Sequence, residues 1–234
     1  PEPDSYSHDP IKTSLVSPAI APKVALVDPD LTLGCAPALT AACAADALGH
    51  AVESCTSRLA NPFSSLLAGH AVERIVRDLP RAMENPRDPG PRESLSLAAT
   101  LAGAALSEAG VTMAHAIAHA LGAVLGVPHG LAVAVGTPAS LRYNAAECVE
   151  VYARLARACS VAGATPEEQA GAFVERVVGL LHSAGLPDHV EAPPGAPPDL
   201  AGRLARSAVQ STPTALKFNP RRIDEAVSYT HLRA

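Results

Sequence analysis

The sequence predicts an all-α protein, a bundle of helices behind a short N-terminal leader that favours β-structure. Three observations support this class. Apolar residues, chiefly Ala, Leu and Val, make up 48% of the 234 residues, while aromatic residues make up 3% and Trp is absent; this composition suits closely packed helices. Prolines and helix-capping residues recur at intervals of one helix length. No β-favouring stretch is long enough to build a sheet.

The leader begins with a polar, turn-rich segment, Pro1–Pro10, and continues with two β-favouring runs, Ile11–Pro18 and Lys23–Val27. The apolar residues Val24–Val27 predict one buried strand. The turn residues Asp28-Pro29-Asp30 end it sharply. Pro1–Pro10 lacks the apolar core of a signal peptide, so we expect a cytoplasmic protein.

Beyond the leader, the pattern predicts helices separated by short loops. Two of them open on capping residues followed by proline at the first helical position, at Asn61-Pro62 and at Thr165-Pro166-Glu167-Glu168. The first two helices are expected over about Thr40–Ser57 and from Asn61 to about Leu79-Pro80, followed by a loop that holds Pro86, Pro89 and Pro91. The next three are expected over Glu93–Glu108, over about Met113–Leu125, and from His129 to Ala134 or beyond, where Pro138 constrains the end of the helix. Two more are expected over Ala146–Val161 and from Thr165 to about Ala184; a stiff connector with Pro193, Pro194, Pro197 and Pro198 then leads to a last helix over Asp199–Val209.

One stretch, from Ala109 to Leu141, contains no Asp, Glu, Lys or Arg and yet holds three histidines. A membrane-spanning helix needs about 20 consecutive apolar residues. Gly126, Pro128 and Gly130 interrupt this stretch near its middle, so neither half is long enough. We therefore expect a soluble protein in which a buried helix, a turn and a second helix follow one another.

Charge and cysteine content exclude several classes of partner. The net charge is −5, which offers neither the basic surface of a nucleic-acid-binding protein nor a polybasic patch for a membrane surface. The five cysteines are scattered without a CxxC pair. We expect them to be buried or bystander thiols in a reducing compartment.

Histidines and one aspartate supply the groups that could do chemistry. Asp46 and His50 are four residues apart on one predicted helix and so share a face. His115 and His119 have the same spacing on another, and His129 stands where a third helix should start. A carboxylate and imidazoles from separate helices can together bind a divalent transition metal.

Each of these residues also has a simpler interpretation. Asp46 and His50 could form a surface pair, His115 and His119 could be hydrogen-bonded core residues, and His129 could merely begin a helix. The combination favours a metal, because burying several polar groups without partners is costly and one cation would satisfy several. The pentapeptide GHAVE occurs at Gly49–Glu53 and again at Gly69–Glu73, which chance explains in Ala/Val-rich helices.

Four landmarks, PKVALVDPDLT (22–32), DALGHAVE (46–53), MAHAIAHALG (113–122) and VPHG (127–130), occur in an order and spacing that resemble the iron-containing alcohol dehydrogenases. The resemblance covers about residues 10–225. It implies the helical bundle domain of the iron-containing alcohol dehydrogenase/dehydroquinate synthase-like fold. It also implies that Fe2+, or Zn2+ in its place, is bound by the family's ligand positions, which fall on Asp46, His50, His115 and His129. His119 matches a catalytic histidine near the nicotinamide and substrate, which would position the cofactor or relay a proton.

The resemblance further implies a division of the chain. Residues 1–30 would be the remnant of a missing N-terminal α/β nucleotide-binding domain, and residues 31–226 the helical metal-binding domain. The leader has no Gly-rich phosphate-binding turn, since the first glycine is Gly34; we therefore expect no cofactor-binding residues here and an NAD(P) site mainly in the missing domain. Residues 227–234, His231 included, depart from the family and resemble translated adapter sequence.

The function implied is that of a metal-dependent, NAD(P)-linked alcohol dehydrogenase or aldehyde reductase. The substrate would be a small alcohol or aldehyde, and the enzyme could be a homo-oligomer. This chain would be a fragment that is inactive alone. Three alternatives stay open: a zinc-dependent polyol dehydrogenase of the glycerol dehydrogenase kind, a stand-alone helical metal-binding or hydrolase domain, and a helical packing module without metal. Metal content, substrate profile and turnover without nicotinamide would distinguish them.

Overall fold

The computed structural model describes residues 10–15 and 17–223, and in these ranges the chain is helical and forms no strand. The predicted all-α class is confirmed. The predicted non-family tail, with His231, and the leader residue His8 lie outside the described residues.

The helices are α1 (Pro37–Thr56), α2 (Pro62–Glu84), α3 (Pro89–Ala109), α4 (Met113–Leu125), α5 (His129–Asn144), α6 (Val149–Ala158), α7 (Pro166–Ser183), α8 (Leu200–Ser211) and α9 (Pro213–Lys217), with short 3-10 turns η1 (Pro18–Ile20), η2 (Pro29–Thr32) and η3 (Ala145–Glu147).

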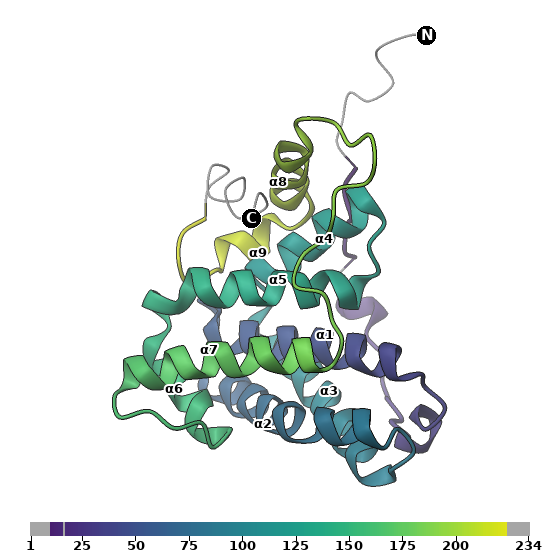
Figure 1. Cartoon of the computed structure of the whole chain (residues 1–234), viewed down its shortest axis with the longest axis vertical. Coiled ribbons are helices and arrows are strands. Elements are labelled where there is room, and N and C mark those ends of the chain that lie inside the picture. Colours follow the sequence, from purple (N-terminus) through teal and green to yellow (C-terminus); the bar gives the residue numbers. More distant parts are fainter. Residues whose placement is uncertain (1–9, 16, 224–234) are drawn as a thin grey trace.

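Two hydrophobic cores organise these helices. The larger core joins α1, α2, α3, α6 and α7, which occupy the lower part of the view in Figure 1. The smaller core joins α4, α5 and α8, with α9 beside them in the upper part. Helix α5 supplies Ala134 to the larger core and Val133 to the smaller one. Because α5 also packs on α1, the boundary between the cores runs along these two helices.

Glycines allow the helices at this boundary to approach closely. A Cβ atom placed on Gly130 of α5 would lie 2.5 Å from the carbonyl oxygen of Ala42 in α1, and one on Gly136 would lie 2.6 Å from that of Ala114 in α4. Real Cβ atoms do not approach backbone atoms so closely. Helix α5 therefore packs directly against the backbones of α1 and α4.

Several predicted helix boundaries are confirmed. Helix α4 spans Met113–Leu125 and ends at Gly126, whose φ of +69° is the left-handed conformation that glycine adopts most easily at a helix end. Helix α5 begins at His129. The caps at Asn61 and Thr165 also form as expected, because each side chain accepts a hydrogen bond from a backbone N–H in the first turn of its helix.

The prolines end fewer helices than the sequence predicts. Helix α2 was expected to stop at Pro80 but continues to Glu84. Proline removes the N–H that would bond the carbonyl four residues earlier; here that carbonyl, of Val76, accepts a hydrogen bond from Arg176 Nη2 at 3.4 Å. Helix α5 likewise runs through Pro138.

Helix α3 begins at Pro89, inside the segment expected to be a loop. Proline is tolerated in the first turn because the N–H groups there have no partner within the helix. Asp88 caps this end, since its side chain accepts a hydrogen bond from Gly90 N–H at 3.0 Å. The short helix α9 was not predicted at all.

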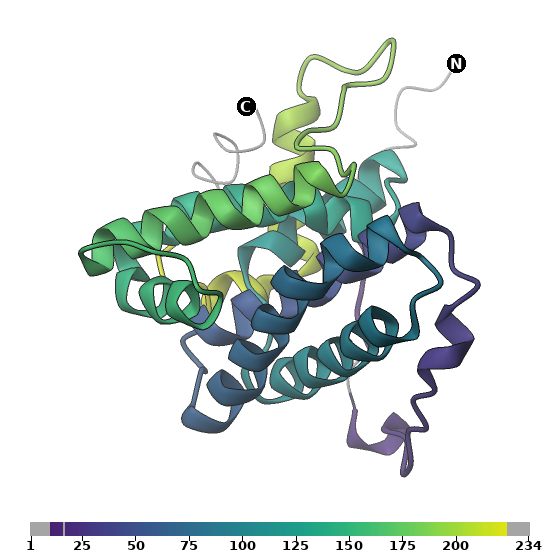
Figure 2. The same ribbon diagram turned by 60° about the horizontal axis from the view of Figure 1, so that its bottom comes forward.

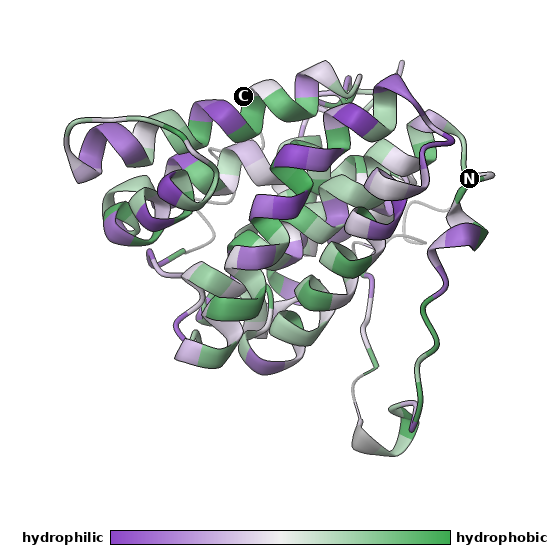
Figure 3. Ribbon diagram, turned by 90° about the horizontal axis from the view of Figure 1, so that it is seen from below, coloured by the Kyte–Doolittle hydropathy of each residue, from purple (hydrophilic) through white to green (hydrophobic). Residues whose placement is uncertain are grey.

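The prediction of a buried strand at Val24–Val27 is wrong. Val24 is 73% exposed and Leu26 is 93% exposed, and the segment pairs with no strand in the described part of the chain. Figure 2 shows the N-terminal segment, in purple, running outside the helices. Figure 3 shows green, hydrophobic stretches on this segment, which stands apart from the bundle. A strand needs neighbours for its backbone hydrogen bonds, and these residues have none here.

Among the described residues, no single helix has the length and hydropathy needed to cross a membrane. Helices α3 and α4, which meet at a bend of 102°, satisfy that criterion only when they are taken together, and only by length and composition.

All five cysteines lie in the described ranges and are free thiols. Cys55 and Cys148 are buried, whereas Cys43 is exposed. Burial raises the pKa of Cys55 to about 11 and that of Cys148 to about 12, so these two are unreactive thiols at neutral pH.

The segment that follows α9 is attached to α5 by a pair of buried amides. Asn219 Nδ2 donates to Asn144 Oδ1 at 2.7 Å and to the carbonyl of Arg221 at 2.7 Å, and Asn144 Nδ2 donates back to Asn219 Oδ1 at 3.1 Å. Both side chains are at most 1% exposed. This exchange ties the segment after α9 to the C-terminal end of α5.

Replacing Asn219 by Ala is expected to lower the free energy of unfolding by about 1–2 kcal/mol, because the buried Asn144 oxygen loses its donor. Urea unfolding followed by circular dichroism measures this. The exposed Asn85 provides the control, since Asn85→Ala removes an amide that lies at the surface. Equal stabilities for the two variants would show that the hydrogen bonds between Asn144 and Asn219 do not stabilise the fold.

Candidate metal centre

Helix α1 presents three polar residues along one face. Asp46, His50 and Glu53 follow one another at spacings of four and three residues, which places them in line on an α-helix. Glu53 is 2% exposed. The face also includes Gly49, which lets Val133 of α5 and the ring of His115 lie against the α1 backbone.

Helices α4 and α5 bring histidines to this face. His115 and His119 of α4 are 3% and 8% exposed. His129 is the first residue of α5, and it follows the turn that Gly126 and Pro128 make possible. The packing of three helices at the boundary between the two cores therefore brings together residues that are far apart in the sequence.

One oxygen lies at the centre of the arrangement. Asp46 Oδ1 lies 3.3 Å from His129 Nε2, 3.4 Å from His115 Nε2 and 3.8 Å from His50 Nε2. Asp46, His50 and His115 each offer one ligand atom, and these atoms all lie within 4.8 Å of one another. The ring of His115 stacks on that of His50 with centroids 4.5 Å apart, and it lies 5.5 Å from that of His129.

Two of the converging atoms are buried without a hydrogen-bond partner among the described residues. They are Asp46 Oδ1 and His115 Nε2. Buried polar atoms normally have partners, and exceptions require a reason. The buried aspartate Asp78 shows the usual case, since it accepts hydrogen bonds from Arg77, Arg81 and Ser94.

A divalent cation would satisfy the unpaired atoms at the centre. Carboxylate oxygen and imidazole nitrogen are ligands that suit zinc and iron, and the negative charge of Asp46 would offset part of the charge of the ion. The residues present therefore fit a transition metal.

The electrostatics of the cluster keep its groups in different protonation states. Burial acts to raise the pKa of Asp46, but the adjacent imidazoles outweigh it and hold that pKa far below its usual range. Burial and the charge of His115 lower the pKa of His50 to about 4. His50 is therefore neutral at pH 7 and keeps a lone pair, which a metal ligand requires.

The pKa of His115 is shifted in the opposite direction from that of His50. Burial acts to lower its pKa, but the carboxylates of Glu53 and Asp46 raise it to about 9. Its two ring nitrogens have distinct surroundings: Nδ1 lies 2.5 Å from Glu53 Oε2, whereas Nε2 faces Asp46. Only Nε2 is directed to the centre of the cluster.

His119 lies one turn along α4, beside the cluster. Its ring makes an edge contact with that of His129, with centroids 5.7 Å apart. Its Nδ1 atom is buried and unpaired among the described residues. Burial and the ammonium of Lys12 lower the pKa of His119 to about 4, and the Lys12 Nζ atom lies 3.4 Å from His129 Nδ1. His119 is thus a neutral group at the edge of the centre.

The remaining described histidines lie at the surface. The side chain of His70 is 47% exposed and faces Glu73 at 3.4 Å. Those of His182 and His189 are 46% and 66% exposed and both face Asp188.

Glu53 is the residue of the site that sequence reasoning missed. Its carboxylate accepts hydrogen bonds from Thr112 Oγ1 and the Ala114 N–H as well as from His115. The signal was present in the sequence, because an acidic residue seven positions after Asp46 lies on the same face of a largely apolar helix.

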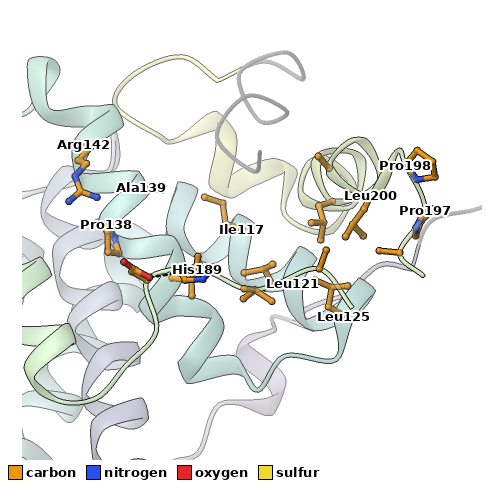
Figure 4. A pocket seen from close by; sticks show the side chains of 17 residues that line it. Ile117, Leu121, Leu125, Pro138, Ala139, Arg142, His189, Pro197, Pro198 and Leu200 are labelled. Carbon is orange, nitrogen blue, oxygen red and sulfur yellow. Dashed lines mark hydrogen bonds and ion pairs between the residues drawn. The ribbon is translucent and has the colours of Figure 1, made fainter. Parts of the chain in front are cut away.

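An open cavity lies on the other side of α4. It has a volume of about 810 Å³ and opens between α4, α5, α8 and the loop that precedes α8. Figure 4 shows its apolar wall, with Ile117, Leu121 and Leu125 of α4 facing Leu200 and Pro197. Ile117 and Leu121 each follow a site histidine by two residues, which places them on the other side of α4. None of the five predicted site residues lines the cavity.

The chain is similar to known proteins over most of its length. Residues 40–228 match the family model described as Fe-containing alcohol dehydrogenase family, C-terminal. The probable alcohol dehydrogenase EutG of Salmonella typhimurium is 33% identical over 215 residues, which cover 92% of this chain and 53% of that protein. The NADPH-dependent butanol dehydrogenase of Clostridium saccharobutylicum is 37% identical over 177 residues, which cover 76% of this chain and 45% of that protein.

The solved structures agree as well. The crystal structure of a 1,3-propanediol oxidoreductase superposes with a TM-score of 0.80 at 32% identity, covering 88% of this chain and 54% of that one. The chain thus spans about half the length of the relatives that it matches.

Proposed function

The chain belongs to the iron-containing alcohol dehydrogenase family, and we propose that it is the metal-holding half of an enzyme that interconverts a small alcohol and its aldehyde with a nicotinamide cofactor. The observation that carries the proposal is the convergence of three imidazoles on Asp46 Oδ1 within 3.8 Å. Relatives that match most of this chain are named alcohol or butanol dehydrogenases.

In the proposed centre, Asp46, His50, His115 and His129 hold the ion. A bound Fe2+ or Zn2+ supplies Lewis acidity toward the oxygen of the alcohol or aldehyde. The chain's own residues shape the surroundings: Asp46 contributes negative charge, and burial of His115 keeps water from one side of the centre.

His119 is the proposed catalytic residue. Its unpaired Nδ1 atom and its pKa of about 4 leave a neutral ring beside the centre. Such a ring can accept a hydrogen bond at Nδ1 from a substrate hydroxyl or a cofactor hydroxyl and so position it. Hydride transfer itself belongs to the nicotinamide.

We propose that the nicotinamide is bound mainly by a nucleotide-binding part outside these residues. Two observations support this: the chain spans about half the length of its relatives, and the leader exposes apolar side chains such as Leu15 and Leu26, beside which residues 10–15 and 17–223 form no strand. Residues 1–30 would then complete that part, and residues 31–226 would form the metal-binding domain.

The purified, metal-free chain is expected to take up one Fe2+, under anaerobic conditions, or one Zn2+ per molecule. It is expected to oxidise NAD(P)H with propanal only when the N-terminal half of a relative is fused before it. Metal analysis after gel filtration measures the metal content, and the decrease in absorbance at 340 nm measures the oxidation of NAD(P)H. The metal-free fusion serves as the control. Metal-dependent ester hydrolysis by the chain without nicotinamide would favour the hydrolase alternative, and failure to bind metal would overturn the proposal.

A further inference from the structure

Glu53 is a fully buried carboxylate that touches a proposed metal ligand without facing the centre itself. It lies on α1 one turn beyond His50 and is 2% exposed. A buried carboxylate is costly unless charge or hydrogen bonds compensate for it, so its contacts identify its role.

The two oxygens of Glu53 have separate partners. Oε1 accepts hydrogen bonds from the Thr112 hydroxyl at 2.8 Å and from the Ala114 N–H at 2.6 Å. Ala114 lies in the first turn of α4, and the side chain of the N-terminal residue Thr112 accepts no hydrogen bond from that turn; Glu53 therefore caps this helix from α1. Oε2 lies 2.5 Å from His115 Nδ1.

The contact with Oε2 decides which nitrogen of His115 carries the proton. In a neutral imidazole one nitrogen is a donor and the other an acceptor. An ionised carboxylate only accepts hydrogen bonds, so the proton belongs on Nδ1. Nε2, which lies 3.4 Å from Asp46 Oδ1, is then the nitrogen that releases its proton when a metal binds at the centre.

We propose that Glu53 is a positioning residue, which holds the His115 ring in place and keeps its proton on Nδ1 so that Nε2 can bind a divalent transition metal. The inference rests on the proposed metal centre. Carboxylates that accept the outer N–H of a ligand histidine orient the ring and strengthen metal binding in other sites. Because the carboxylate comes from α1 and the ring from α4, the contact also holds the two helices in register at the centre.

The second copy of the GHAVE pentapeptide provides a matched control. Glu73 occupies the position in α2 that Glu53 occupies in α1, but its side chain is 38% exposed and it faces His70 and Arg77 at the surface. A Glu→Gln change at either position alters the same local sequence, and only one of the two carboxylates touches the centre.

The test compares Glu53→Gln with Glu73→Gln in the whole chain. Gln at position 53 has nearly the same size, and its oxygen can still accept the two hydrogen bonds that Oε1 now accepts. Its NH2 group then faces His115 Nδ1 and donates, which moves the ring proton to Nε2. We expect the Zn2+ affinity, from competition with a chromophoric chelator, to fall 10–100-fold in Glu53→Gln. Glu73→Gln should bind as the native chain does.

A measurement on the native sequence covers the case in which Glu53→Gln does not fold. In the Zn2+-loaded chain with 15N-labelled histidine, we expect a protected proton on His115 Nδ1, assigned by its loss in His115→Ala. A proton on Nε2 in the Zn2+-loaded chain would overturn the inference and remove His115 from the proposed ligands. Equal Zn2+ affinities for native chain and folded Glu53→Gln would overturn the inference while leaving the metal centre in place. Absence of Zn2+ binding by the native chain would overturn the metal centre and the inference together.

Discussion

His50→Ala is expected to weaken Zn2+ binding roughly 100-fold. The binding free energy of Zn2+ at sites with four protein ligands is about 10–16 kcal/mol, so each ligand contributes about 3 kcal/mol on average. A loss of about 3 kcal/mol corresponds to a roughly 100-fold weaker affinity. The effect should be this large because the His50 ring is neutral and lies 3.8 Å from Asp46 Oδ1, so no rearrangement is needed to use it. Competition titration with a chromophoric chelator at fixed pH measures the affinity.

The repeated pentapeptide again supplies the control, because His70 occupies the equivalent position in α2. His70→Ala removes a surface imidazole whose neighbours are Glu73 and Arg74, and it should leave the affinity unchanged. If the two variants bound Zn2+ equally well, His50 would not be a ligand, and the surface-pair interpretation of Asp46 and His50 would be preferred.

Gly49→Ala is expected to destabilise the fold, whereas Gly69→Ala is expected to stabilise it. A Cβ on Gly49 would lie 2.6 Å from Cγ1 of Val133, which is fully buried. Such overpacking costs about 1–3 kcal/mol. A Cβ on Gly69 would lie 3.9 Å from the side chain of Leu155, an ordinary contact, so the higher helix propensity of Ala should stabilise this variant by up to about 1 kcal/mol.

Urea unfolding of the metal-free proteins measures both changes without a contribution from ligand binding. Gly49→Ala should also reduce Zn2+ affinity, because the added methyl group pushes α5, which carries His129, away from α1. A shift of both stabilities in the same direction would show that the α1–α5 boundary is less tightly packed than the Val133 contact indicates.

Much of the helical framework was accessible from local sequence. The bounds of α4 and the start of α5 follow from Gly126, which adopts the left-handed conformation, and from the proline that precedes His129. The caps of α2 and α7 are equally local, since each depends on a side chain and a backbone N–H only a few residues apart.

Predictions failed where a partner distant in sequence decides the outcome. Pro80 does not end α2, because Arg176 of α7 binds the carbonyl that the proline leaves free. Val24–Val27 has the composition of a buried strand, but burial requires a neighbouring strand, and the described residues provide none. In both cases the local pattern was correctly identified and the tertiary environment changed its result.

The same distinction applies to the site. The spacing of Asp46 and His50 predicts a shared helix face, and it leaves open whether that face meets His115 and His129. The distances of 3.3–3.8 Å from Asp46 Oδ1 depend on the close packing of α5 on α1 and α4. Glu53 escaped prediction because its partners, Thr112, Ala114 and His115, are supplied by another helix.

The sequence by itself determined where most of the helices lie and which of their residues share a face, since these properties depend largely on neighbours within a few positions. It made the two GHAVE segments identical, both within helices. Only the tertiary structure decided that Glu53 is buried against His115 while Glu73 faces solvent. The physical reason is that burial and partner choice depend on which helices pack against a face, and that packing is settled by contacts across the whole chain.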